Sequence, residues 1–88
     1  MKELFNTLQA LENRMAELDE QLEENPEDEK IMEEWDATYK KEFDTHEKIV
    51  KILLETLKKS GMKDITRATV NAMMATRRDQ LLAIVEMI

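Results

Sequence analysis

Carboxylates are the reactive side chains that this chain supplies most freely. They crowd between Glu17 and Asp36, where Lys30 is the only base. Paired carboxylates can hold divalent cations, but a di-metal helical bundle also needs Glu-x-x-His motifs, and an EF-hand loop needs glycine at its sixth position. Neither pattern occurs in the sequence. We therefore interpret most of the acidic stretch as solvated helix surface.

The residues that usually act as nucleophiles or metal ligands are scarce. There is no cysteine, and His46 is the only histidine. Ser60 is the only serine, and one glycine cannot form a phosphate-binding loop. The sequence therefore predicts no catalytic residue, no cofactor site and no metal site, and we expect a protein that is not an enzyme.

Binding to another protein is the function that the acidic residues favour. We expect the contact surface near residues 25–28, with Trp35 as an aromatic anchor among carboxylates. Six acidic residues, called the acidic shoulder below, make up the rest of this surface: Glu23, Glu24, Glu27, Asp28, Glu33 and Glu34. The predicted role is that of a small adaptor, regulator or inhibitor of another protein, with a basic protein as the candidate partner.

Two alternatives involve nucleic acid. A rigid helix rich in carboxylates can imitate a phosphate backbone, as acidic decoys among small phage-encoded inhibitors do, and so block a basic nucleic-acid-binding protein. Direct binding through the basic region 58–78 is disfavoured. Its helix–turn–helix likeness fails at Leu57, where a small residue is preferred, and at Arg67, where a buried aliphatic is expected. The net charge of −7 also repels phosphates.

The elements that must position these residues are helices. A single Gly and a single Pro in 88 residues leave little room for loops. Apolar residues spaced by four and three form the a/d seam of a coiled coil and predict a helix over residues 2–24: Leu4, Leu8, Leu11, Met15, Leu18 and Leu22. We predict an all-α protein with one domain, residues 1–88.

A second helix is expected over residues 26–59. Asn25 is a suitable N-cap, Pro26 is well placed at the first helical position, and Gly61 can end the helix in the left-handed conformation. The abrupt change at Asn25 favours a long antiparallel hairpin with the first helix. In the first half of this second helix, the apolar residues on one side are Ile31, Met32, Trp35, Tyr39 and Phe43.

A third helix is expected over residues 65–87, giving an architecture like a three-helix bundle. The segment 49–57 is apolar around most of its circumference, and the chain finishes on an apolar run, so both need cover. This predicts a homodimer joined through Ile49, Ile52, Leu53, Leu57, Leu81, Ile84 and Ile88.

The sequence also bears on location. No apolar run approaches the roughly 20 residues that cross a bilayer, and the first residues enter the leucine seam directly, without the apolar core of a signal peptide. We expect a cytoplasmic protein with no membrane contact.

Overall fold

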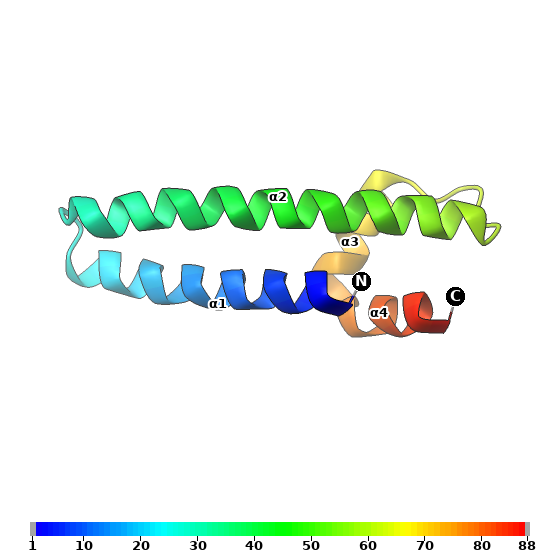
Figure 1. The fold of residues 1–88 in the computed structure, drawn as a ribbon, viewed down its shortest axis with the longest axis horizontal. Helices are drawn as coiled ribbons and strands as arrows, with labels where there is room; N and C mark the ends of the chain where they lie inside the picture. The colour runs from blue at the N-terminus through cyan, green and yellow to red at the C-terminus, as the bar shows by residue number, and fades with distance from the viewer. Residues whose placement is uncertain (1, 88) are drawn as a thin grey trace. The chain divides into compact units, whose positions relative to one another are not determined.

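Four helices and no strand make up the part of the chain that the computed structural model describes, residues 2–87 (Figure 1). They are α1 (Lys2–Glu24), α2 (Glu29–Lys59), α3 (Arg67–Thr76) and α4 (Arg78–Met87). The all-α prediction is confirmed. The chain divides into two compact units, one of residues 3–46 and one that contains Glu47 and the residues after it.

In the first unit, α1 packs against the first part of α2 (Figure 1). Leu8 and Leu18 of the α1 seam are buried, and the other four seam residues are half-buried. Phe5, which lies outside the seam, is buried as well. The amphipathic spacing of α1 therefore marks its covered side, while the depth of burial varies along it.

Within the first unit, the side of α2 that is buried differs from the side on which Tyr39 and Phe43 lie. Thr38 is buried and Ile31 is half-buried, whereas Tyr39 and Phe43 are exposed. The helix period of about 3.6 residues explains the difference, because Ile31 and Thr38 are seven residues apart and share one line. The aromatic residues follow a neighbouring line.

Residues 25–28 form a turn between α1 and α2, and the helix expected from Pro26 begins three residues later, at Glu29. The Asp28 N–H donates to the Asn25 carbonyl at 3.2 Å, which places Pro26 at the second position of a β-turn, where its fixed φ is favourable. Asp28 replaces Asn25 as the cap, because its Oδ1 accepts from the N–H groups of Lys30 and Ile31 at 3.0 and 3.3 Å.

Helix α2 ends in a Schellman motif. Gly61 has a φ of 102°, the Met62 N–H donates to the Leu57 carbonyl, and the Gly61 N–H donates to the Lys58 carbonyl. Lys58 and Lys59 lie in the last turn, where positive charge complements the helix dipole.

The second unit has an apolar core. Seven side chains from α2, α3 and α4 are at most 2% exposed: Ile49, Val50, Leu53, Leu57, Val70, Met74 and Leu81. Burial of this apolar surface is the main force that holds the three short segments together.

The single helix expected over residues 65–87 is wrong, because the chain breaks at Arg77. Thr66 caps α3 through its Oγ1, and Arg77 ends α3 with a φ of −137° and a ψ of 39°. The Leu81 N–H donates to the Arg77 carbonyl, which starts α4. The Arg78 Nε donates to the Met74 carbonyl at 3.3 Å, so a side chain replaces a backbone donor that the break removes.

Candidate functional site

The acidic shoulder lies within the first unit, at the turn and in the helix ends beside it. Glu23 and Glu24 end α1, Glu27 and Asp28 lie in the turn, and Glu33 and Glu34 belong to the first turns of α2. All six side chains are exposed. The turn at residues 25–28 connects the end of α1 to the start of α2, and the two helices pack against each other (Figure 1).

Charge is distributed very unevenly between the two units. Residues 3–46 contain fifteen acids and four bases, a net charge of −11, whereas residues 47–88 contain five acids and eight bases, a net charge of +3. A concentration of one sign on a small unit produces a field that attracts partners of the opposite sign. The first unit therefore holds most of the negative charge of this protein.

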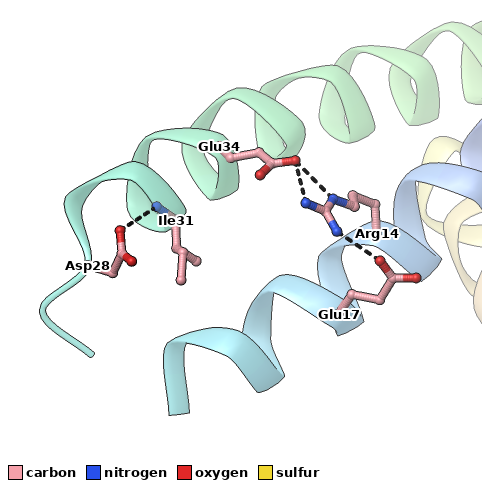
Figure 2. Close-up of polar contacts among 5 residues, drawn as sticks. All are labelled: Arg14, Glu17, Asp28, Ile31 and Glu34. Carbon is pink, nitrogen blue, oxygen red and sulfur yellow. Dashed lines mark hydrogen bonds and ion pairs between the residues drawn. The ribbon is translucent and has the colours of Figure 1, made fainter. Parts of the chain in front are cut away.

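Two of the predicted site residues already have structural roles. Figure 2 shows Arg14 between two carboxylates: its Nε and Nη2 donate to Glu34 Oε1 at 2.9 and 2.6 Å, and its Nη1 donates to Glu17 Oε2 at 2.9 Å. These hydrogen bonds, first those to Glu34 and then that to Glu17, raise the pKa of Arg14 above its ordinary value. Asp28 caps α2 through its contact with Ile31 in the same view.

Trp35 lies beside the shoulder with its indole ring fixed from two directions. Its Nε1 donates to Asp19 Oδ1 of α1 at 2.8 Å. Its ring stacks on Tyr39, with ring centroids 5.4 Å apart and planes inclined by 5°. Trp35 also lines an open hollow with Leu22, Met32 and Asp36. The ring is therefore held in place and still reachable from solvent, since it is only half-buried.

An exposed apolar row extends from this hollow along α2. Met32 is 50% exposed, Tyr39 is 50% exposed and Phe43 is 55% exposed. The sequence grouped these residues on one side of the helix, but reasoning from the sequence treated the acids as the contact surface and missed the exposed aromatic row.

The residues predicted to mediate self-association are mostly enclosed by the chain itself. Ile49, Leu53, Leu57 and Leu81 are at most 1% exposed in the single chain. Ile84 is half-buried, and only Ile52 of this set is exposed among the described residues. Ile88 lies outside the described residues. The apolar surface of the four core residues is thus already covered without a second copy.

The basic region 58–78 is partly neutralised within the second unit. Arg67 donates from its Nη2 to Glu47 Oε2 in an ion pair. Lys58, Lys59 and Lys63 are exposed. These bases flank the end of α2 and the loop before α3 rather than one recognition helix.

No group of three or more metal-ligating side chains is found within residues 2–87. In the same part of the chain, every helix is too short or too polar to cross a membrane. Comparison with protein-family models, with curated proteins and with solved structures finds no match to this chain.

Proposed function

We propose that this protein is a non-enzymatic interaction module, an adaptor, regulator or inhibitor that binds another protein through the acidic shoulder and Trp35. The observation that carries the proposal is the setting of Trp35. Its ring is anchored by Asp19, stacked on Tyr39 and open to a hollow at the edge of the acidic shoulder. A rigid, partly exposed aromatic ring surrounded by charge is the usual centre of a protein contact.

The finer architecture belongs to the same proposal. We propose that α1 and α2 form a long antiparallel hairpin, that the C-terminal helices complete a bundle-like domain, and that two copies associate. Ile52 and Ile84 are the residues of the predicted dimer face that are not enclosed in the core. A protein of 88 residues gains stability from association, because its own core is small.

One alternative has a specific observation in its favour. The net charge of −11 on residues 3–46 supports an acidic decoy that occupies the nucleic-acid groove of a basic protein. Under this alternative we propose that the protein is a phage-encoded inhibitor of this kind. Direct nucleic-acid binding through region 58–78 has less support, since Arg67 is paired with Glu47.

The experiment compares two triple variants that change the net charge equally. Glu23→Gln, Glu27→Gln and Glu33→Gln together remove charge from the shoulder and spare the residues that pair with Arg14 or cap α2. The control combines Glu20→Gln, Asp44→Asn and Glu55→Gln, which are exposed positions outside the shoulder. Wild type and both variants, each tagged, capture partners from a lysate, and each captured protein is then purified for direct titration.

We expect the shoulder variant to bind the purified partner at least about tenfold more weakly, which is about 1.4 kcal/mol, and the control to bind like wild type. Equal loss in both variants would mean that only net charge matters. The decoy reading adds two expectations: duplex DNA displaces the partner, and affinity falls steeply with salt. Equal binding by all three proteins would refute the acidic shoulder as the contact surface.

A further inference from the structure

The exposed apolar row on α2, called the α2 stripe below, consists of Met32, Trp35, Tyr39 and Phe43. Their spacing of three, four and four residues resembles one edge of a coiled-coil seam. At about 100° per residue, the four positions fall within an arc of about 80°, and they extend over about 17 Å of helix. The stripe therefore has the width and length to receive about three turns of another helix.

Most of the α2 stripe is left uncovered within the first unit, because three of its four side chains are half exposed or more. Large apolar side chains gathered in one row, rather than scattered singly, mark an interaction site. The stacked rings of Trp35 and Tyr39 add a flat, rigid surface at its centre. The open hollow lined by Leu22, Met32 and Trp35 lies at one end of the stripe.

The charges beside the α2 stripe select its occupant. Asp19 accepts the Trp35 N–H on one edge, and Asp36 lines the hollow. Glu29 lies seven residues before Asp36 and so follows the same edge of α2. Of the three α2 bases in this segment, Lys40 lies four residues after Asp36 and so near the same edge, whereas Lys30 and Lys41 lie on the opposite side of the helix. The borders of the stripe are therefore mainly acidic.

A second copy of the first unit is disfavoured as the occupant. Two such units would bring together net charges of −11 each, and like charges across an interface are unfavourable. A partner with Lys and Arg beside an apolar row meets the acidic borders with opposite charge. Its Lys and Arg side chains can also form cation–π interactions with the ring faces of Trp35 and Tyr39.

We propose that the α2 stripe is the docking face for a basic amphipathic helix of another protein. Apolar side chains of that helix cover Met32, Tyr39 and Phe43 and enter the hollow, while its Lys and Arg residues lie against Asp19, Glu29 and Asp36. This inference rests on the proposed function, because it names the chemistry of the partner that the interaction module binds.

The test uses a designed peptide and so needs no natural partner. The probe is a helix of about 18 residues, long enough to be helical in water, with leucines on one face, lysines and arginines on the flanks, and no Trp or Tyr. A second peptide keeps the leucine face and carries glutamates on the flanks. Trp35 is the only tryptophan of the protein, so its fluorescence reports occupancy of the stripe directly.

We expect the basic peptide to shift Trp35 emission to shorter wavelength with a micromolar Kd, and the acidic peptide to have no effect. The variant with Tyr39→Ala and Phe43→Ala should bind at least about tenfold more weakly. Its control, with Ile52→Ala and Met62→Ala, removes exposed apolar side chains outside the stripe and should bind like wild type. Circular dichroism checks that both variants keep wild-type helicity.

Three results would overturn the inference: no binding of the basic peptide, equal binding of the two peptides, or equal affinity of the two double variants. Light scattering that finds a dimer abolished by the stripe variant would instead assign the face to a second copy and also overturn it. None of these results bears on the proposed function. The proposed function is tested by a different measurement, the affinity of a purified natural partner for the variants of the acidic shoulder.

Discussion

Leu53 and Ile52 are neighbours on α2 with opposite environments, and they provide a direct test of where the core of the second unit lies. Leu53 is 0% exposed and Ile52 is 40% exposed. Replacement by alanine removes three carbon atoms from either side chain. At about 0.8 kcal/mol for each buried carbon, Leu53→Ala loses about 2.4 kcal/mol of transfer free energy.

The space left at Leu53 adds to this loss, since fully buried leucines cost about 3–5 kcal/mol when truncated. Ile52→Ala opens onto solvent, leaves no enclosed cavity and gains about 0.4 kcal/mol of helix propensity. We expect it to cost about 1 kcal/mol or less. The two variants should therefore differ in their free energy of unfolding by at least about 2 kcal/mol.

Urea unfolding followed by circular dichroism measures both values by linear extrapolation. An 88-residue protein has a total stability of only about 4–13 kcal/mol, so Leu53→Ala can unfold the protein outright. Leu53→Val, which removes one carbon and costs about 1 kcal/mol, keeps the transition measurable in that event. Values for Leu53→Ala and Ile52→Ala that agree within about 0.5 kcal/mol would contradict the burial of Leu53.

Other substitutions test the ends and the seam of the helices. Gly61→Ala should destabilise the protein by about 1–2 kcal/mol, because an L side chain is strained at a φ of 102°; an unchanged urea midpoint would argue against the Schellman motif. Asp28→Ala should lower the free energy of unfolding by about 0.5–2 kcal/mol, because it removes the cap of α2, and Asn25→Ala should lower it clearly less. A larger loss for Asn25→Ala than for Asp28→Ala would instead identify Asn25 as the cap. Leu18→Ala should lower the free energy of unfolding by about 2–5 kcal/mol, and Leu11→Ala, at a half-buried position, by about 1–2 kcal/mol. Urea unfolding measures both values, and equal losses would mean that the α1 seam is buried evenly.

The features that the sequence predicts well are those that local chemistry determines. The bounds of α1 follow from its leucine spacing, and the end of α2 follows from Lys59 and Gly61. The left-handed glycine needs no information from the rest of the chain, because only the backbone decides it. These signals are confined to a few neighbouring residues.

The break at Arg77 could not be predicted, because neither proline nor glycine marks it. It depends on non-local packing: Met74 of α3 and Leu81 of α4 are both fully enclosed in the core. Asp79 in the first turn of α4 is the one local sign of a new helix start. The cap of α2 was misplaced for a different reason, since Asn25-Pro26 suits a β-turn as well as a helix start.

The candidate site was predicted in part. Exposed acids and Trp35 can be read from composition and spacing, but the exposure of Tyr39 and Phe43 requires knowing which line of α2 faces α1. Thr38, a polar residue, occupies the buried position on α2 instead. Periodicity alone cannot choose between two adjacent lines when one of them contains threonine.

Helix α2 has few buried neighbours in its first part and many in its second part, and this difference affects how easily each part opens. Only Phe5, Leu8, Leu18 and Thr38 are buried within residues 3–46, against seven core side chains in the second unit. Segments with few buried contacts open at lower free energy, so backbone amides of α2 before His46 should exchange with solvent faster than those after it. Trp35 lies in the half of the helix for which we expect the faster exchange. A partner bound there would slow amide exchange most strongly in that half.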